Sequence, residues 1–368
     1  MAPLINAIDS APEINLVVAV TAQHREMLDQ VNALFGIQPD IDLDILQSGQ
    51  SLTEITTRAL DGLVPAIAAV KPDAVVVQGD TTTTFVGALA AFYQQVPVVH
   101  LEAGLRTYNR YSPYPEEINR RLTSQLSSLH LAPTPASRSN LLREGVDPKS
   151  VVVTGNTVID ALLATVRHRV PYGNADLEAL DGDPRRVVLV TAHRRESWGQ
   201  AMHDVGHALA ELADDPEIVI VFPVHRNPIV REAILPPLAG RDNVVITEPL
   251  DYGAFVRIMN RASIIITDSG GVQEEGPSLG KPVLVMRDTT ERPEAVTAGT
   301  ARLVGTDRQT LVAATSRLLY NNDAYNAMAT AVNPYGDGKA SDRSVAAIAE
   351  LLGVGRRIAD FSPSPDQC

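Results

Sequence analysis

The amino-acid sequence predicts an α/β protein made of two doubly wound, Rossmann-like domains that face each other across a cleft. Short apolar runs rich in Val and Ile alternate with longer stretches of helical periodicity, which is typical of a parallel sheet covered by helices. The runs are apolar without interruption, as expected for strands buried on both faces. The pattern occurs on both sides of the polar stretch 172–184, and 368 residues are enough for two hydrophobic cores.

The elements of each domain follow from this alternation. In the first domain, predicted at 1–165, strands are expected at 14–20, 74–78, 96–101 and 151–155, with helical patterns after the first, second and fourth. In the second domain, predicted at 166–338, strands are expected at 186–192, 218–224, 243–249, 263–267 and 282–286. A helix at 339–355 could pack back on either domain, and the Pro- and Ser-containing tail 356–368 is expected to be disordered.

The chain opens in an unusual way for a wound α/β domain, in which a helix follows a strand. The first residues, "MAPLINAI", resemble the end of a helix, and the first apolar run comes only at Ile14–Val20. The sequence therefore predicts that the first strand and its turn are missing from the N-terminal domain.

Composition argues against several classes of function. The formal charge of −13, from 31 Lys and Arg against 44 Asp and Glu, repels nucleic-acid phosphates, although a few local arginines can still bind a phosphorylated metabolite. No apolar run approaches the roughly 20 residues that span a bilayer, so no membrane partner is expected. A start without the features of a signal peptide and a single cysteine, Cys368, predict a cytoplasmic protein without disulfides.

Polar residues that follow the apolar runs are the first candidates for function, because ligands of open α/β sheets bind beyond the carboxyl ends of the strands. In the first domain these residues are Asp80, Glu102 and Glu116. Asp80 can also be interpreted as a helix N-cap, and Glu116 as a first-turn acid that opposes the helix dipole. For Glu102, a functional role and a plain loop position both remain open.

In the second domain, His193 follows a strand and lies beside two arginines, which is typical of a loop that binds an anionic ligand. A structural histidine is the alternative. His225 follows the next strand, where a turn residue before Asn-Pro is the alternative. Arg287 and Arg292 come after a later strand, and for each of them surface charge is the alternative.

The stretch "SIIITDSGGVQEE" ends a predicted strand in two glycines. Ser269, Gly270 and Gly271 lie where this strand turns into a helix expected to begin near Val272, so backbone N–H groups at the positive helix end can approach a diphosphate. An ordinary tight turn with a Ser cap is the alternative. The spacing is neither the Rossmann fingerprint nor a P-loop. Glu275, one helical turn further, could accept hydrogen bonds from ribose hydroxyls.

Eight motifs, taken together, resemble the non-hydrolysing UDP-N-acetylglucosamine 2-epimerases. They run in the order of that family from Met1 to about residue 350: "TAQHREMLDQV", "GDTTTT", "HLEAGLRT", "SPYPEEINRRLT", "TGNTVIDAL", "TAHRRES", "DSGGVQEEGPSLGKPVLVMRDTTERPEAV" and "NPYGDGKAS". The resemblance implies a GT-B type fold and an isomerase that interconverts UDP-N-acetylglucosamine and UDP-N-acetylmannosamine for polysaccharide or cell-wall synthesis. It also implies a homodimer that uses no cofactor and no metal.

The resemblance further implies a mechanism and roles for residues. In the family, UDP leaves C1 as the C2 proton is removed, and it re-adds to the resulting glycal after a proton returns on the opposite face. Matching motifs make Asp80, Glu102 and Glu116 the acid/base carboxylates and place His193 near the leaving diphosphate. The matching UDP contacts are Phe255 at the uracil, Ser269, Gly270 and Gly271 at the phosphates, Glu275 at the ribose, and Arg292 at the diphosphate or sugar. For Phe255, a core residue within a helix is the alternative. Candidates for a second, activating substrate site are Gln47, Gln50 and His225.

The start of the chain departs from this family. Family members begin with a strand, then Gly-Thr-Arg-Pro-Glu and a Lys shortly before the Met-Ala-Pro-Leu with which this sequence opens, and the Arg and Lys contact substrate. Either Met1 is a mis-set start or the protein is shortened and impaired, and the intact state of every other motif favours the mis-set start. The alternative functions are a GT-B glycosyltransferase, a hydrolysing epimerase, and a chain that binds UDP-sugar with little turnover.

Overall fold

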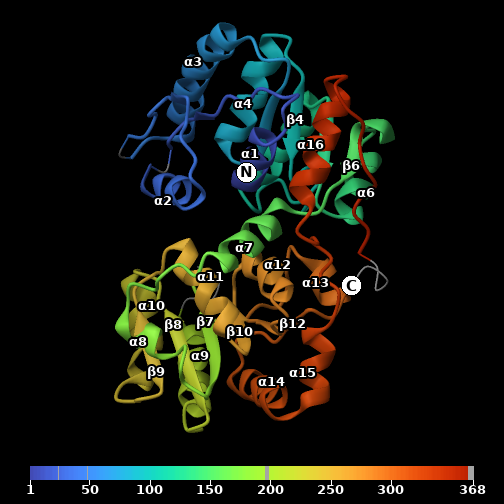
Figure 1. The fold of residues 1–368 in the computed structure, drawn as a ribbon. Coiled ribbons are helices and arrows are strands. Elements are labelled where there is room, and N and C mark those ends of the chain that lie inside the picture. The colour runs from blue at the N-terminus through green and yellow to red at the C-terminus, as the bar shows by residue number, and fades with distance from the viewer. Residues whose placement is uncertain (24, 48, 195–198, 364–368) are drawn as a thin grey trace. The chain divides into compact units, whose positions relative to one another are not determined.

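The computed structural model describes residues 1–23, 25–47, 49–194 and 199–363. The chain divides into two compact units, of which the first comprises Met1–Ala161 and Tyr335–Ser362 and the second chiefly Leu162–Pro334. The chain passes from the first unit to the second within α7 (Thr157–Arg167). It later returns to the first unit, where α16 (Ala340–Leu351) packs against α1 near the N-terminus (Figure 1).

The first unit is a parallel α/β structure. Its other helices are α1 (Ala2–Asp9), α2 (Arg25–Phe35), α3 (Leu52–Val70), α4 (Thr82–Tyr93), α5 (Glu116–Leu126), α6 (Pro135–Arg143) and the 3₁₀ turn Pro148–Ser150. Its strands are β1 (Ala19–Val20), β2 (Ile41–Asp42), β3 (Val75–Gln78), β4 (Val98–Leu101), β5 (Leu129–Ala132) and β6 (Val151–Val153). Strands β3, β4, β5 and β6 form one parallel sheet in that order, and β1 and β2 form a separate parallel pair.

The first apolar run forms less strand than the sequence predicts. A strand was expected over 14–20, but β1 covers only Ala19–Val20, because its single partner within the described chain is the equally short β2. Strand β3 likewise pairs only with β4 in the described part of the sheet, so it is an edge strand. Consequently Val75 and Val76 of β3 are half-buried, whereas every residue of β4 is buried.

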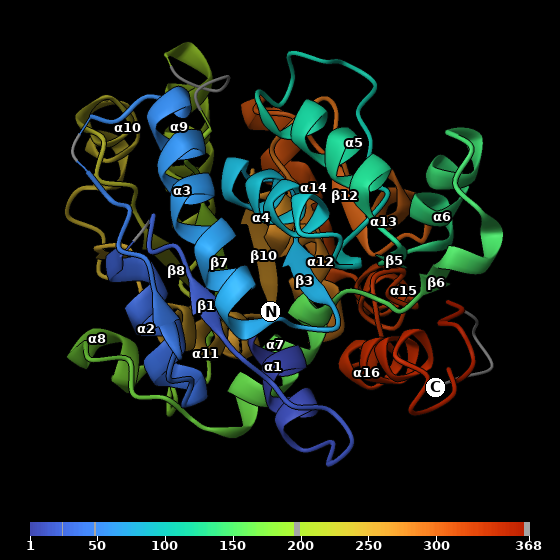
Figure 2. The same ribbon diagram turned by 90° about the horizontal axis from the view of Figure 1, so that it is seen from above.

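Helices cover both faces of the four-stranded sheet. On one face, Leu4 of α1 and Ile348 of α16 pack with Leu101 and Leu131 of the central strands in one apolar cluster. On the other face, α3 and α4 lie side by side and pack over β3 (Figure 2). Helix α3 begins with a capping box, in which Ser51 and the residue three positions on satisfy each other's backbone N–H groups.

The chain beyond α16 also contacts the first unit. Of the tail that was expected to be disordered, 356–368, the last residues 364–368 lie outside the described structure. The ring of Phe361 is buried and the Arg343 guanidinium lies 5.5 Å from its centroid. The N–H of Phe361 donates to the carbonyl oxygen of Val153 at 2.7 Å, so this part of the tail lies along β6.

The second unit is a six-stranded parallel sheet with helices. Its helices are α8 (Ala175–Ala179), α9 (Gln200–Leu212), α10 (Pro228–Ile234), α11 (Tyr252–Arg261), α12 (Gly270–Ser278), α13 (Pro293–Thr297), α14 (Arg308–Tyr320), α15 (Asn322–Ala329) and the 3₁₀ turn Pro236–Leu238. Its strands are β7 (Arg186–Thr191), β8 (Ile218–Pro223), β9 (Val244–Thr247), β10 (Ile264–Thr267), β11 (Val283–Val285) and β12 (Ala301–Leu303). All five strands predicted here are present, and β12 is an additional one. None of the helices in the described part of the chain is long and apolar enough to cross a membrane.

The strand order of this sheet marks a binding edge. The order is β12-β11-β10-β7-β8-β9, so the chain runs outward from β7 to β9 and then outward in the other direction from β10 to β12. The order therefore reverses between β7 and β10, and the loops that follow these two strands diverge. Ligands of open α/β sheets bind at this kind of switch point, which directs attention to the residues after Thr191 and Thr267.

Candidate functional site

Two carboxylates lie at the carboxyl edge of the sheet in the first unit. Asp80 comes shortly after β3 and Glu102 directly follows β4. The N–H of Gly79 donates to the carbonyl oxygen of Leu101 at 3.0 Å, which aligns the two strand ends. A Cβ atom at Gly79 would lie 3.8 Å from Glu102 Oε2. The structure thus places Asp80 and Glu102, two of the three carboxylates singled out from the sequence, at adjacent strand ends of one sheet edge.

The backbone of Glu102 adopts an unusual conformation. Its φ is +66°, in the left-handed region that residues other than glycine rarely occupy. Such strain costs on the order of 1–3 kcal/mol and persists where the surrounding structure imposes it, frequently at functional sites. Six other described residues besides glycine also have a positive φ, so the functional role of Glu102 stays a prediction.

Asp80 is held by α5 and does not cap a helix. The N-cap of α4 is Thr81, whose side chain accepts from the N–H of Thr84, so the capping interpretation of Asp80 is wrong. Arg120 Nη2 donates to Asp80 Oδ2 at 2.6 Å, and Asn119 Nδ2 donates to its carbonyl oxygen at 3.0 Å. These bonds fix both the carboxylate and the backbone of Asp80.

The third predicted carboxylate, Glu116, is the first residue of α5. It therefore lies on the helix that holds Asp80, and it also occupies the first turn, where an acid opposes the helix dipole. Its Oε2 is buried and has no hydrogen-bond partner among the described residues. The structure thus leaves both interpretations of Glu116 in place.

The neighbouring acid, Glu117, is fully buried and organises the loop before α5. Its carboxylate accepts hydrogen bonds from the N–H of Thr107 at 3.0 Å, the N–H of Tyr108 at 3.1 Å and the Thr107 hydroxyl at 3.1 Å. Arg120 Nη1 donates to it at 3.2 Å. Glu117 therefore links the loop to the same arginine that holds Asp80.

Replacing Glu117 by Gln is expected to destabilise this loop by about 3 kcal/mol. An amide cannot accept four hydrogen bonds as a carboxylate does, so it leaves buried donors unsatisfied and removes one of the two carboxylates that pair with Arg120. Hydrogen exchange of the amides over 107–126 should show the corresponding increase in opening. Glu116→Gln on the same helix is the matched control, with an expected change below about 1 kcal/mol; equal protection in E117Q and wild type would contradict the role of Glu117.

His100 supports the turn that carries Asp80. Its ring is fully buried within β4, and Nε2 lies 2.8 Å from the carbonyl oxygen of Gly79. Burial lowers the pKa of His100 to about 3, despite the opposing effect of this hydrogen bond, so the ring is neutral and Nε2 is the donor. The uncharged His100 ring thus holds the backbone of Gly79, the residue directly before Asp80, by a hydrogen bond.

In the second unit, the switch point joins a histidine and an aspartate. His193 follows β7 and Asp268 follows β10. Asp268 Oδ2 accepts the N–H groups of His193 and Arg194, both at 2.8 Å, and Asp268 Oδ1 lies 2.8 Å from His193 Nδ1. The hydroxyls of Thr191 and Thr267 lie 2.6 Å apart across the two strands below. Asp268 is a site residue for which no role was predicted, although its position directly after a buried strand is a signal that could have identified it.

Asp268 is an ionised group in a buried position. Burial acts to raise its pKa, but the close approach of the His193 ring and the hydrogen bonds from the N–H groups of Arg194 and His193 outweigh burial and lower it. The side chain of His193 is exposed and available to a ligand. The following residues of this loop, including Arg195 and Glu196, lie outside the described residues.

Helix α12 begins at the double glycine. Its first residue is Gly270 and its N-cap is Ser269, so the start expected near Val272 is two residues too late. The four N–H groups at a helix start have no partner within the helix, and they carry the positive end of its dipole. Ser269, Gly270 and Gly271 therefore lie where an anion would be stabilised.

A carboxylate of the protein already lies at this helix start. A Cβ atom at Gly270 would be 2.9 Å from Glu291 Oε1, which shows how closely the two segments approach. Glu291 also bridges two arginines, with Arg194 Nη2 at 2.6 Å and Arg287 Nη1 at 2.6 Å. Burial opposes ionisation of Glu291, but the hydrogen bond from Arg287 and the two arginine charges lower its pKa to about 2. This corner of the unit thus accommodates a permanent negative charge.

Two further predicted contacts lie along α11 and α12. Glu275 of α12 is buried, and a Cβ atom at Gly271 would lie 3.8 Å from its Oε2. The hydroxyl of Tyr252 donates to Glu275 Oε1 at 3.0 Å. Phe255 is half-buried and lies three residues after Tyr252 on the same face of α11. Glu275 and Phe255 are therefore presented by two helices that the Tyr252 hydrogen bond ties together.

Arg292 was expected to contact a diphosphate or sugar. In the structure its guanidinium pairs with Glu274 on α12, and only 16% of its side chain is exposed. Arg292 is therefore anchored on the helix that carries the glycines and Glu275, with its charge already partnered.

The residues predicted for a second substrate site are divided between the units. Gln47 and Gln50 are in the first unit, where the N–H of Gln47 donates to Gln50 Oε1. His225 is an exposed residue of the second unit, and its Nδ1 accepts from the N–H of Asn227 at 3.1 Å. That bond supports the turn interpretation of His225 and does not address a second site.

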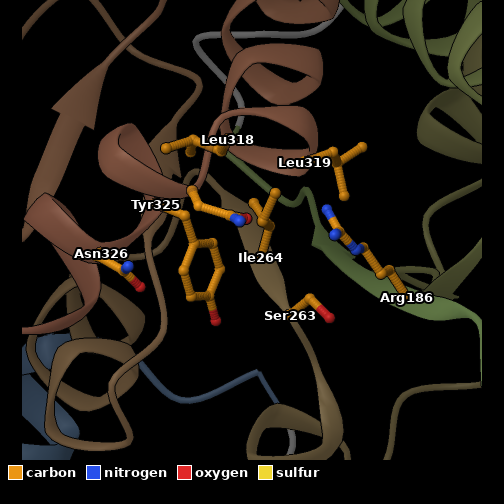
Figure 3. A pocket seen from close by; sticks show the side chains of 8 residues that line it. Arg186, Ser263, Ile264, Leu318, Leu319, Tyr325 and Asn326 are labelled. Carbon is orange, nitrogen blue, oxygen red and sulfur yellow. The ribbon is translucent and has the colours of Figure 1, made fainter.

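A separate cavity of about 300 Å³ lies at the opposite edge of the sheet in the second unit (Figure 3). It is lined by Arg186 and Ile264, which are the first residues of β7 and β10, and by residues of α14 and α15. None of the residues predicted for function lines it. The cavity is therefore distinct from the switch point, where the polar groups gather.

Comparison with known proteins identifies the chain's relatives. A family model described as UDP-N-acetylglucosamine 2-epimerase matches residues 6–349. The chain is 55% identical over 356 residues to UDP-N-acetylglucosamine 2-epimerase of Escherichia coli strain K12, covering 95% of this chain and 94% of that protein. It is also similar to the crystal structure of UDP-GlcNAc 2-epimerase from Neisseria meningitidis bound to UDP-GlcNAc, with 48% identity, a TM-score of 0.84 and 96% of each chain covered.

A more distant structure supports the same relationship. The Methanocaldococcus jannaschii UDP-GlcNAc 2-epimerase, solved in complex with UDP-GlcNAc and UDP, is 32% identical, with a TM-score of 0.75 and 96% of each chain covered. The family match over nearly the whole chain, the high identity and the shared fold agree with one another. The chain therefore belongs to the UDP-N-acetylglucosamine 2-epimerase family.

Proposed function

We propose that this protein interconverts UDP-N-acetylglucosamine and UDP-N-acetylmannosamine, by eliminating UDP and adding it back. The observation that carries the proposal is the convergence of Asp80 and Glu102 at one sheet edge. Inversion at C2 needs one group to remove the C2 proton and another to return a proton on the opposite face, and two neighbouring carboxylates can supply both. The chain's relatives named as UDP-N-acetylglucosamine 2-epimerases support the choice of substrate.

The proposal divides the chemistry between the two units. In the first, a carboxylate takes the C2 proton while the C1–O bond to UDP breaks, and the electron pair of the C–H bond becomes the C1=C2 double bond of a glycal. Protonation of C2 from the other face and return of UDP to C1 complete the inversion. Asp80 and Glu102 are the proposed acid and base. Glu116 is the third candidate, on α5, the helix whose Asn119 and Arg120 hold Asp80.

In the second unit, the proposed role is to bind UDP and stabilise its negative charge as it leaves. The start of α12 at Ser269, Gly270 and Gly271 offers N–H groups to the diphosphate, with His193 and the arginines at the same edge. Glu275 would accept from the ribose hydroxyls and Phe255 would contact the uracil. Arg292 would contact the diphosphate or sugar from the loop before α13, where it pairs with Glu274 of α12.

The test is incubation of the protein with UDP-N-acetylglucosamine alone in deuterated water. We expect UDP-N-acetylmannosamine that carries deuterium at C2, with no requirement for an acceptor and no accumulation of UDP. Steady release of UDP and free sugar would instead indicate a hydrolysing epimerase. Sugar transfer that needs an acceptor would indicate a glycosyltransferase, and binding without deuterium incorporation would indicate a protein that only holds the nucleotide sugar.

Replacing Glu291 by Gln is expected to tighten UDP binding by about five- to ten-fold. The Glu291 carboxylate bridges Arg194 and Arg287 against Gly270, so a diphosphate must compete with it for charge-assisted hydrogen bonds. The Gln amide has nearly the same shape as the Glu291 carboxylate but no charge, so it competes less strongly with UDP for the two arginines. Isothermal titration calorimetry with UDP measures the effect, with the exposed Glu217→Gln as matched control. Weaker binding by E291Q would show that Glu291 orders the two arginines for the ligand.

We also infer a homodimer in the cytoplasm. A twofold dimer is the commonest assembly of oligomeric enzymes, and a single cysteine is consistent with a reducing compartment. Light scattering coupled to size-exclusion chromatography would give the mass of the assembly, which should be twice that of the 39.5 kDa chain.

A further inference from the structure

The tyrosine at the start of α11 forms a hydrogen bond that no predicted role accounts for. Tyr252 is half-buried and its hydroxyl donates to Glu275 Oε1 at 3.0 Å. Glu275 itself is 6% exposed, and its other oxygen, Oε2, lies toward Gly271 at the start of α12. One oxygen of the carboxylate is therefore tethered to α11, while the other lies toward the proposed UDP site.

The surroundings of Glu275 disfavour its negative charge, with Tyr252 as the exception. Burial and the charge of Glu274 on the same helix raise the pKa of Glu275, the Tyr252 hydrogen bond lowers it, and the result is about 7. The Glu274 carboxylate is paired with Arg292 from the loop before α13. The strands beneath α12 present apolar groups, since a Cβ atom at Gly276 would meet Val283 and Ile265. Tyr252 is thus the group from a neighbouring element that favours ionisation of Glu275.

Tyr252 can supply this hydrogen bond at any physiological pH. Burial and the adjacent carboxylate raise the pKa of Tyr252 well above its ordinary value, so its hydroxyl keeps its proton and remains a donor. Ribose presents two neighbouring hydroxyls, and both can donate to one carboxylate only when that carboxylate is ionised, because a protonated acid has a donor in place of one acceptor.

We propose that Tyr252 is a positioning residue that holds one oxygen of Glu275 and so orients its carboxylate as the acceptor for the ribose hydroxyls of UDP. The inference rests on the proposed function, because it assumes that UDP binds at α12. It adds a specificity residue on α11 that does not itself need to touch the nucleotide.

The experiment is calorimetric titration of UDP into wild type and Tyr252→Phe between pH 6 and pH 9. Loss of the hydrogen bond should raise the pKa of Glu275 by about one unit, which makes the ionised fraction at pH 7 about five-fold smaller. We therefore expect UDP binding to weaken about five-fold at pH 7 and to recover almost fully at pH 9. A carbon-13 titration of the Glu275 carboxyl without ligand should show the same upward shift of its pKa.

Three further measurements make the result decisive. Tyr320→Phe is the matched control, because Tyr320 is exposed and its hydroxyl also donates to a carboxylate, that of Asp215; it should leave UDP binding unchanged at every pH. 2′-Deoxy-UDP lacks one ribose hydroxyl, so the affinities of wild type and Y252F for it should differ less than their affinities for UDP. In a Glu275→Gln background, which cannot titrate, Y252F should no longer alter the pH dependence.

The outcomes distinguish this inference from the proposed function. Weakening of UDP binding by the same factor at every pH would show that Tyr252 only packs against α12, and unchanged binding would show that it has no role; either result overturns the inference while UDP binding by the wild type stands. Failure of the wild type to bind UDP would instead overturn the proposed function and, with it, the role of Tyr252 toward ribose.

Discussion

Replacing Glu102 by Gln, or Asp80 by Asn, is expected to lower kcat for epimerisation by about 10²–10⁴-fold in each case. Proton transfer by a positioned carboxylate contributes about that factor, and an amide can neither take nor return the proton. Both substitutions preserve shape, so UDP affinity should change little. The reason to expect so large an effect is geometric, because both carboxylates lie at one sheet edge and Asp80 is fixed by two hydrogen bonds from α5.

The two variants should also differ from each other in a recognisable way. If one carboxylate serves each face of C2, each variant keeps one working base. That base can still remove the proton from the epimer it faces, return a deuteron to the same face and restore UDP. E102Q and D80N should therefore each incorporate deuterium into one epimer without inverting it, and the two variants should do so from opposite epimers.

Mass spectrometry and proton NMR of both UDP-sugars, incubated separately in deuterated water, would measure this exchange. The exposed acids Glu26→Gln and Asp73→Asn are matched controls in the same unit and should keep wild-type kcat. Exchange from the same epimer in both variants would show that Asp80 and Glu102 act on one face. Near wild-type epimerisation in either variant would remove that residue from the mechanism.

The parallel sheets could be predicted because buried parallel strands have a simple sequence signature. The runs at 186–192 and 263–267 became the central strands β7 and β10, which are almost wholly buried. Strands with a mixed pattern were missed, among them β5 (Leu129–Ala132), which carries a histidine, and β12 (Ala301–Leu303), which carries an exposed arginine. The strand expected at 14–20 is only two residues long because strand length depends on a partner, and pairing is not a local property of the sequence.

Part of the candidate site could be predicted from the sequence, because the ends of the buried strands could be predicted. Asp80, Glu102 and His193 all follow predicted strands, so the sheet alone places them at the binding edges. Residues that orient other side chains of the site could not be assigned such a role from their position in the sequence. Tyr252 contacts Glu275 from 23 positions away in the chain, and Asp268 contacts His193 from 75. The first pairing arises only when helices α11 and α12 pack together, and the second only when the sheet brings two distant strand ends together.

Because the sheet brings Asp268 next to His193, we expect Asp268 to matter for catalysis although it is not one of the proposed acid/base carboxylates. Its carboxylate accepts two backbone N–H groups from the His193 loop and lies 2.8 Å from His193 Nδ1. A carboxylate in this position favours a proton on Nδ1 and sets the orientation of the ring. The other ring nitrogen, Nε2, can then interact with the leaving diphosphate in the proposed mechanism.

Asp268→Asn is therefore expected to lower kcat by about 10²-fold, the upper range for loss of a partner that orients a functional histidine. One amide oxygen can still accept the backbone N–H groups, but the NH₂ group then faces Nδ1 and favours the other tautomer of His193.

The pKa of Asp268 is lowered from 3.8 in the folded protein, so the stability that its ionised form contributes is present above about pH 4 and is lost as the pH falls through the lowered value. D268N should lack this acid-dependent contribution.

Steady-state kinetics on D268N, His193→Ala and the double variant would test this role, with the exposed Asp288→Asn as control at a neighbouring strand end. Because Asp268 is argued to act through His193, the double variant should be no slower than H193A alone, whereas independent contributions would multiply. A multiplicative loss would mean that Asp268 supports catalysis by another route, for instance through Arg194, whose N–H it also accepts. Wild-type kcat in D268N would show that the backbone hydrogen bonds, which an amide oxygen preserves, are sufficient to hold His193.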